Sequence, residues 1–221
     1  MSSPQQHRLT SDSLLRSYML GLFPMADSVE AKDLFWVDPD LRGVIPFDAF
    51  HVSRSLRKTI RKGRFEVTFD GDFKGVMEAC REKRPERPSS WINDEIIELY
   101  CELHERGHAH SVETRLDGKL VGGLYGVSLG AAFFGESMFS HMTDASKTAL
   151  VYLVARLKSG GYTLLDTQFQ TEHLSSFGAV EVPRGRYHTY LQEALETAAD
   201  FYSLPVNTSP EAVLQLIDHK S

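Results

Sequence analysis

The sequence predicts an α+β fold in which a mainly antiparallel sheet is flanked by helices. Three observations lead to this prediction. Apolar and polar residues alternate as in strands over residues 111–139, with a turn sequence, Asp117-Gly118, inside that section. Apolar residues at helical spacing follow over residues 146–158, and residues 162–169 have the composition of a buried strand. The order strand, strand, strand, helix, strand is typical of one sheet covered by helices.

The N-terminal section predicts a small domain of its own. A short helix is expected at residues 11–22, and Phe23-Pro24 then begins an irregular stretch. We place the boundary after residue 48, which gives a small N-terminal domain at residues 1–48 and a main domain at residues 49–221.

The main domain begins with helical and strand patterns in alternation. A basic helix, a strand and a second helix are expected at residues 55–62, 65–69 and 73–83. Gly63 ends the first of these helices, and a loop with Pro85 and Pro88 follows the second. Asn93 is a favourable N-cap for the next helix, since Asn side chains accept hydrogen bonds from the first free backbone N–H groups.

The hairpin prediction depends on the Asp117-Gly118 pair. A two-residue turn of type I′ needs positive φ at both positions, which Asp and Gly tolerate. A third strand at residues 131–139 is expected to pair with this hairpin. The C-terminal tail, with Asp200, Pro205 and Pro210, is expected to wrap over the domain or fray. These elements together resemble the core of the acetyltransferase (GNAT) superfamily, which is the fold class we predict.

Composition excludes several classes of protein. The chain has 221 residues, 42% of them apolar and 24% charged, and no apolar run approaches the roughly 20 residues needed to cross a bilayer. The start lacks the pattern of a secretory signal, and Cys80 and Cys101 are too few for a disulfide framework. We expect a cytoplasmic protein without membrane attachment.

The charge of the chain is unevenly distributed. The net charge is −6, yet residues 51–91 contain eleven basic and six acidic residues. A local excess of positive charge suits binding to a phosphate backbone, and a solvated helix face is the alternative explanation.

Residues 104–108 spell His-Glu-x-x-His, the pattern of zinc proteases. That chemistry needs both histidines on one face of a continuous helix. Gly107 is expected to end the helix, which would leave His108 beyond it and away from the face of His104. We therefore predict no metal site here.

A second alternative is acetyl-coenzyme A chemistry, which requires a glycine-rich loop at a helix N-terminus. The nearest match, residues 156–161, lies at an expected helix C-terminus, where the helix dipole disfavours an anion. The fold without this loop indicates a different acyl donor.

The candidate reaction centre consists of three polar residues on otherwise apolar strands. Glu136 lies within the expected third strand, and Asp166 and Gln168 lie two residues apart on the last strand, which places them on one face. Such groups need partners, which either a cleft or a buried hydrogen-bond network provides. The pattern alone leaves both possibilities open.

These residues belong to a longer series that resembles the bacterial leucyl/phenylalanyl-tRNA-protein transferase family. The matching blocks are residues 100–113, 120–126, 135–140, 145–150 and Asp166-x-Gln168, preceded by residues 21–24, 35–39, 51–55 and 90–92. The series is ordered and covers about residues 14–190.

The resemblance implies transfer of Leu, and also Phe or Met, from aminoacyl-tRNA to proteins that begin with Arg or Lys, which marks those proteins for degradation by the N-degron pathway. No cofactor is implied, because the aminoacyl ester is already activated. By resemblance Gln168 holds the attacking amine or the carbonyl, Asp166 polarises Gln168 and helps remove the proton, and Glu136 contacts a substrate ammonium group. The protein is expected to act as a monomer.

The resemblance also implies an aminoacyl pocket and a tRNA surface. The predicted pocket residues are Leu124, Phe133, Met138, Leu150, Leu153 and Leu165. The predicted contacts to the 3′-terminal adenosine are Trp91, Met25 and Tyr100. The predicted contacts to the tRNA backbone are Arg54, Arg57, Lys58, Arg61 and Lys62.

The chain departs from the family pattern at three places. The N-terminal section is shorter, Met25 stands where an aromatic residue is common, and Thr171 replaces an asparagine. Two other functions fit part of the sequence: another tRNA-dependent peptidyl transferase of the same fold, and a non-catalytic RNA-binding module that uses only the basic section.

Overall fold

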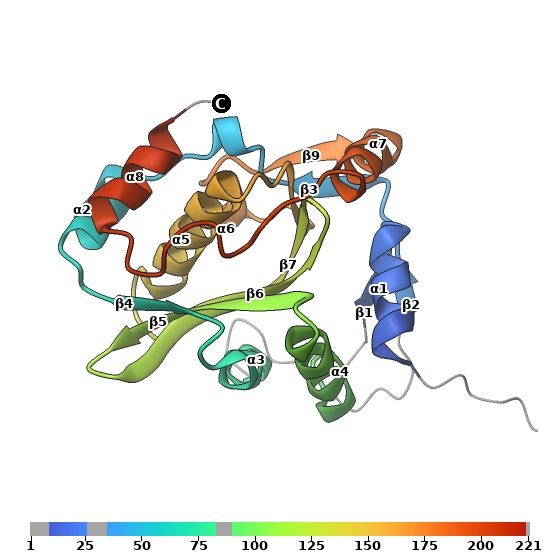
Figure 1. The fold of residues 1–221 in the computed structure, drawn as a ribbon, viewed down its shortest axis with the longest axis horizontal. Helices are drawn as coiled ribbons and strands as arrows, with labels where there is room; N and C mark the ends of the chain where they lie inside the picture. Colours follow the sequence, from blue (N-terminus) through green and yellow to red (C-terminus); the bar gives the residue numbers. More distant parts are fainter. Residues whose placement is uncertain (1–8, 26–34, 83–89, 220–221) are drawn as a thin grey trace, which may run out of the picture.

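The computed structural model describes residues 9–25, 35–82 and 90–219. Its main feature is a seven-stranded sheet in the order β4-β5-β6-β7-β8-β3-β9 (Figure 1). The strands are β3 (Leu41–Val44), β4 (Glu66–Phe69), β5 (Ala109–Leu116), β6 (Lys119–Leu129), β7 (Ala132–Ser140), β8 (Leu164–Gln168) and β9 (Val180–Pro183). Only β7 and β8 pair in parallel, and the remaining neighbours are antiparallel. The predicted fold class, a mixed and mainly antiparallel sheet flanked by helices, is therefore confirmed.

Helices cover both faces of this sheet. They are α1 (Ser11–Met19), α2 (Arg54–Arg61), α3 (Phe73–Arg81), α4 (Asp94–Glu105), α5 (Ala145–Ser159), α6 (Glu172–Ser175), α7 (Arg184–Leu195) and α8 (Pro210–Asp218), with a 3₁₀ turn at Phe47–Ala49. One core cluster joins the sheet to α1, α3, α4 and α7, and a second joins it to α2, α5 and α8. Figure 1 shows α3 and α4 on one side of the sheet and α5 with α2 and α8 on the other.

Local sequence signals predicted the middle of the chain well. Asp117 and Gly118 have φ values of 51° and 74° and join β5 to β6, as the type I′ turn required. The Asn93 side chain accepts a hydrogen bond from Ile96 N at 2.9 Å and so caps α4. The loop predicted around Pro85 and Pro88 lies outside the described residues.

The sheet contains two strands that the sequence did not indicate, β3 and β9. β3 lies between β8 and β9, and Val44 pairs with Asp166. Its residues fall in the section assigned to the N-terminal domain, and the division at residue 48 stays a prediction. A separate two-stranded sheet, β1 (Phe23–Met25) with β2 (Phe35–Val37), lies near α1 (Figure 1).

The C-terminal section wraps over the domain and forms two helices, α7 and α8, so it is not a frayed tail. α7 packs near β3, β8 and β9, while α8 packs on α5 and α2. The Arg57 guanidinium binds the Asp218 carboxylate through two hydrogen bonds of 2.9 and 2.6 Å, which link α2 to α8. Within residues 9–25, 35–82 and 90–219, no helix has the length and apolar character that crossing a bilayer requires.

Candidate active site beside an apolar cavity

Glu136 lies half-buried on β7 and receives hydrogen bonds from three directions. Tyr18 of α1 donates to Oε1 at 2.6 Å, Tyr100 of α4 donates to Oε2 at 3.2 Å, and Gln168 Nε2 of β8 donates to Oε1 at 2.8 Å. The two tyrosine hydroxyls also contact each other. Both tyrosines are fully buried, so these donors are held in place by core packing.

Burial raises the pKa of Glu136 from its ordinary 4.5 to about 7. The hydrogen bonds from Tyr18 and Gln168 oppose this shift because they stabilise the carboxylate, whereas the nearby negative charge of Asp166 adds to it. Burial also raises the pKa of Tyr18 and Tyr100 well above the usual range, so their hydroxyls remain protonated donors. Glu136 can thus exchange a proton near neutral pH.

Asp166 is fully buried and pairs with Arg42, which is 1% exposed. Arg42 Nη2 donates to Oδ2 at 2.6 Å and Nε donates to Oδ1 at 3.0 Å, while the Tyr187 hydroxyl donates to Oδ2 at 2.7 Å. The guanidinium carbon of Arg42 lies 4.5 Å from the ring centres of both Phe23 and Tyr187. This arrangement compensates the buried charge with opposite charge, hydrogen bonds and aromatic faces.

Gln168 joins the two carboxylates. Its backbone N–H donates to Asp166 Oδ1 at 2.7 Å, and its side chain reaches Glu136. Its φ of 63° is unusual for a residue other than glycine, and it turns the chain where Phe169 N bonds Thr167 O at 2.7 Å. The structure therefore brings together the three residues proposed from the sequence, with Gln168 in a turn at the end of β8.

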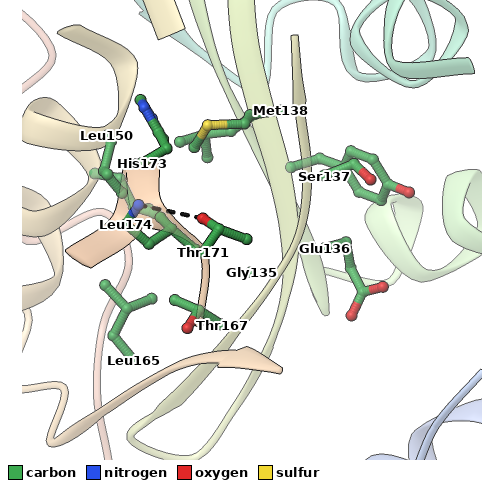
Figure 2. Close-up of a pocket in the computed structure, with 13 residues that line it drawn as sticks. Gly135, Glu136, Ser137, Met138, Leu150, Leu165, Thr167, Thr171, His173 and Leu174 are labelled. Carbon is green, nitrogen blue, oxygen red and sulfur yellow. Dashed lines mark hydrogen bonds between the residues drawn. The ribbon is translucent and has the colours of Figure 1, made fainter. Parts of the chain in front are cut away.

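An apolar cavity of about 220 Å³ lies beside Glu136. Five of the six predicted pocket residues line it: Leu124, Met138, Leu150, Leu153 and Leu165. Phe133, the sixth, is fully buried in the core and stacks on Phe201 with ring centres 6.1 Å apart. Figure 2 shows Leu150 and Leu165 across the open space from the β7 strand that carries Met138 and Glu136.

The wall of the cavity is completed by the short helix α6 and by its N-cap, Thr171, which the sequence marked only as a departure from the family pattern. Thr171, His173 and Leu174 line the cavity, and Thr167 lines it from β8. Thr171 Oγ1 accepts a hydrogen bond from Leu174 N at 3.2 Å, which caps α6 (Figure 2). A Thr three residues before Leu174 is a usable N-cap signal, although it gives no indication of the cavity.

The residues predicted to contact the tRNA differ in their exposure. Trp91 and Met25 are half-buried, and the Trp91 ring meets the Tyr100 ring edge-on at 6.3 Å. Tyr100 is fully buried, so its ring has no exposed face on which an adenosine could stack. Its hydroxyl donates a hydrogen bond to Glu136.

On the predicted backbone-binding helix, α2, the cationic side chains of Arg54, Lys58, Arg61 and Lys62 are exposed. Arg57 is half-buried and already paired with Asp218. Four of the five predicted cations on this helix are therefore accessible to a phosphate backbone.

Neither the His-Glu-x-x-His pattern at residues 104–108 nor the segment of residues 156–161 has the local structure that its expected chemistry requires. α4 ends at Glu105, and Gly107 has a φ of 77°, so His108 lies beyond the helix as predicted. His104 Nδ1 bonds the carbonyl of Ala109 at 2.8 Å. Arg156 is fully buried on α5, where its guanidinium carbon lies 3.7 Å from the ring centre of Phe69. Residues 156–161 therefore do not form a loop at a helix N-terminus.

The site combines an apolar cavity with a carboxyl group and a side-chain amide that are hydrogen-bonded to each other. The cavity can hold an apolar side chain, Gln168 offers an amide beside it, and Glu136 offers a group that titrates near neutral pH. The sequence prediction also missed the side chains that bind the two carboxylates from α1, β3 and α7, which are Tyr18, Arg42 and Tyr187.

Comparisons with known proteins show the family to which the chain is similar. A family model described as leucyl/phenylalanyl-tRNA protein transferase matches residues 44–192, and a model of the N-terminal domain of that family matches residues 7–40. The chain is 58% identical to a leucyl/phenylalanyl-tRNA–protein transferase of Rhodopseudomonas palustris, over 90% of this chain and 88% of that protein. It is also 58% identical to the protein of the same name from Paramagnetospirillum magneticum, over 87% of this chain and 92% of that protein.

Among solved structures, the crystal structure of FemX superposes with a TM-score of 0.54 at 12% identity, over 78% of this chain and 66% of that chain. At this identity the similarity concerns the fold alone.

Proposed function

The chain belongs to the leucyl/phenylalanyl-tRNA protein transferase family, and from this premise we propose that it transfers an amino acid from aminoacyl-tRNA to the N-terminus of a protein. We infer Leu, and also Phe or Met, as donors and proteins with N-terminal Arg or Lys as acceptors, which directs those proteins to N-degron degradation. The observation that carries the proposal is the apolar cavity of about 220 Å³ whose wall includes Glu136.

The reaction needs positioning and proton transfer. The α-amine nitrogen of the acceptor attacks the ester carbonyl carbon, the new amide bond forms, and the bond to the 3′-terminal ribose oxygen breaks. The amine gives up a proton, and the leaving ribose oxygen gains one. The ester is already activated, so neither ATP nor coenzyme A takes part. The donor side chain in the cavity places its carbonyl carbon near Glu136 and Gln168, which favours attack by holding the reacting groups together.

We propose different roles for the three polar residues. Gln168 orients the amine or the carbonyl through its side-chain amide, and Glu136 accepts the proton because its pKa lies near 7. Asp166 was predicted to help remove the proton. Its oxygens already accept hydrogen bonds from Arg42, Tyr187 and the Gln168 backbone, which favours a positioning role for Asp166.

The tRNA is proposed to bind on two surfaces. Trp91 and Met25, both half-buried, would contact the 3′-terminal adenosine, and the exposed cations of α2 would contact the phosphate backbone. We also propose that the protein works as a monomer in the cytoplasm.

The test of the proposed function is a transfer assay with radiolabelled leucyl-tRNA and peptides that begin with Arg, Lys, Asp or Ala. We expect label on the Arg and Lys peptides. Gln168→Ala is expected to reduce transfer by about 100- to 1000-fold while tRNA binding is retained, because an oriented donor beside the reacting carbonyl is lost.

The matched control is Gln192→Ala, an exposed glutamine on α7, which should keep full activity. Full transfer by Gln168→Ala contradicts the assigned site. Binding of tRNA without transfer to any peptide by the wild type supports the non-catalytic RNA-binding alternative, and transfer to a different amine acceptor supports another tRNA-dependent peptidyl transferase.

Donor selectivity should follow the size of the cavity. Leu153→Phe fills part of the cavity. We expect the kcat/KM for phenylalanyl-tRNA to fall by about 10- to 200-fold relative to that for leucyl-tRNA, because small differences in size in an apolar pocket have effects of this order. Leu150→Ala enlarges the cavity and should shift the ratio towards phenylalanyl-tRNA. The ratio of the two kcat/KM values is the measurement, and an unchanged ratio in both variants contradicts this location of the donor side chain.

A further inference from the structure

Lys147 lies in the first turn of α5, the helix that provides Leu150 and Leu153 to the cavity wall. Leu150 follows Lys147 by three residues, about 4.5 Å along the helix axis, so the two side chains are neighbours on the helix surface. His173 lines the cavity from α6, and its pKa is lowered by burial and then by the positive charge of Lys147. The ammonium group of Lys147 therefore lies beside the cavity, near the wall that α6 forms.

The topology of the sheet places the start of α5 at the same edge as the reaction centre. β7 and β8 pair in parallel, and α5 is the crossover between them, so α5 starts at the carboxyl ends of these strands. Ser146 N of α5 donates to Oγ of Ser140, the last residue of β7, at 3.2 Å. Gln168 is the last residue of β8. Lys147 and Gln168 therefore lie at one edge of the sheet.

The charge of Lys147 is not compensated by an acid within the described part of the chain. None of the ion pairs found there includes Lys147, which is half-buried. Asp144, three residues earlier, accepts a hydrogen bond from Thr59 Oγ1 of α2 at 2.9 Å. An ammonium group in this position favours an anion, and the dipole at the start of α5 has the same preference.

The two surfaces proposed for the tRNA lie on opposite faces of the sheet, and Lys147 lies between them. The exposed cations belong to α2, on the α5 side, whereas Trp91 meets Tyr100 of α4 on the other side (Figure 1). The hydrogen bond between Thr59 and Asp144 links α2 to the start of α5, and the cavity begins one helical turn further along α5. A strand that runs from α2 to the reaction centre along these contacts passes Lys147.

We propose that Lys147 binds a phosphodiester group at the 3′ end of the donor tRNA. This inference rests on the proposed function and adds a positioning contact for the donor between α2 and the cavity. An ammonium group binds phosphate oxygens as a point charge and reads no base, which suits the CCA end that all aminoacyl-tRNAs share. The contact holds the last nucleotides so that the ester lies at Gln168 while the aminoacyl side chain enters the cavity.

The test compares leucyl donors that differ in their phosphates. Leucyl-adenosine has none, the leucyl-CCA trinucleotide has only those of the 3′ end, and leucyl-tRNA has all of them. Transfer to a peptide that begins with Arg is measured with the wild type, Lys147→Gln, Lys147→Arg and Lys74→Gln, an exposed lysine on α3 that serves as the matched control.

Loss of one charge-assisted contact should lower kcat/KM for leucyl-CCA and leucyl-tRNA by about tenfold in Lys147→Gln. The value for leucyl-adenosine should not change, because this donor has no phosphate to lose. Lys147→Arg keeps the charge and should restore most of the activity, and Lys74→Gln should match the wild type with every donor.

Salt provides a second measurement on leucyl-tRNA itself. The logarithm of the affinity falls linearly with the logarithm of the salt concentration, and each phosphate contact on a single strand adds about 0.7 to the slope. Lys147→Gln should lower the slope by this amount, whereas Lys74→Gln should keep the wild-type slope.

A loss confined to the donors with phosphates supports the proposal. Equal kcat/KM values for Lys147→Gln and the wild type with leucyl-CCA overturn it, and so does an equal loss with leucyl-adenosine, because that loss does not depend on a phosphate. If the wild type uses leucyl-tRNA alone, an unchanged salt slope in Lys147→Gln overturns the contact and a reduced slope supports it. Wild-type protein that transfers leucine from none of the donors overturns the proposed function itself.

Discussion

Replacing Arg42 with methionine is expected to lower the free energy of unfolding by about 3–5 kcal/mol. The substitution leaves the Asp166 carboxylate buried, with the Tyr187 hydroxyl and the Gln168 N–H as its remaining donors and no positive charge beside it. A buried charge that loses its partner keeps its desolvation cost. Equilibrium unfolding in urea, followed by circular dichroism, measures the change.

The matched control is Arg57→Met, which removes the Arg57–Asp218 pair between α2 and α8. Asp218 is 58% exposed, so water replaces the lost hydrogen bonds and the expected change is below about 1 kcal/mol. If the two variants unfold at the same urea concentration, the Arg42–Asp166 pair does not have the structural role described here.

Glu136→Gln is expected to reduce transfer by about 100- to 10,000-fold. The variant keeps the size of the side chain and removes the proton acceptor. Wild-type kcat should rise with pH and level off above about 7, because only the deprotonated carboxylate accepts a proton. In the variant this inflection should be absent.

The acceptor α-amine also titrates, near pH 8. The informative quantity is therefore the ratio of wild-type to variant kcat measured at each pH with the same peptide, since the titration of the peptide cancels in it. Tyr18 and Tyr100 remain in place in the variant, and tRNA binding serves as the check that the fold is intact. A ratio that stays constant from pH 5.5 to 8.5 contradicts Glu136 as the proton acceptor.

Those parts of the fold that rest on local chemistry could be predicted from the sequence. The Asp117-Gly118 turn fixed the hairpin, Asn93 marked the start of α4, and Gly107 marked its end. In each case the interaction that determines the local structure involves residues only a few positions apart, so it can be recognised from the local sequence.

β3 and β9 were missed for the opposite reason. Each has four residues, and their stability comes from pairing with strands far away in the chain. In β3 the apolar Leu41 is exposed and the charged Arg42 is buried, which is the reverse of what their residue types indicate.

The candidate site was predicted in part. Glu136, Asp166 and Gln168 attracted attention because polar residues on apolar strands need partners. Arg42 could not be identified as one of those partners, because an arginine in a short segment is exposed in most proteins and only the fold buries this one.

The position of β3 has a consequence for the order in which the protein is made. Arg42 lies near the start of the chain, yet its partners Asp166 and Tyr187 belong to segments that leave the ribosome near the end of synthesis. Before β8, β9 and α7 are synthesised, the Arg42 guanidinium lacks its carboxylate partner Asp166, and β3 has no strand to pair with on either side. Pairing across most of the chain length also slows folding, because a long loop has to close first. A chain that ends before β8 lacks Asp166, Gln168 and Tyr187, so it cannot form the proposed reaction centre.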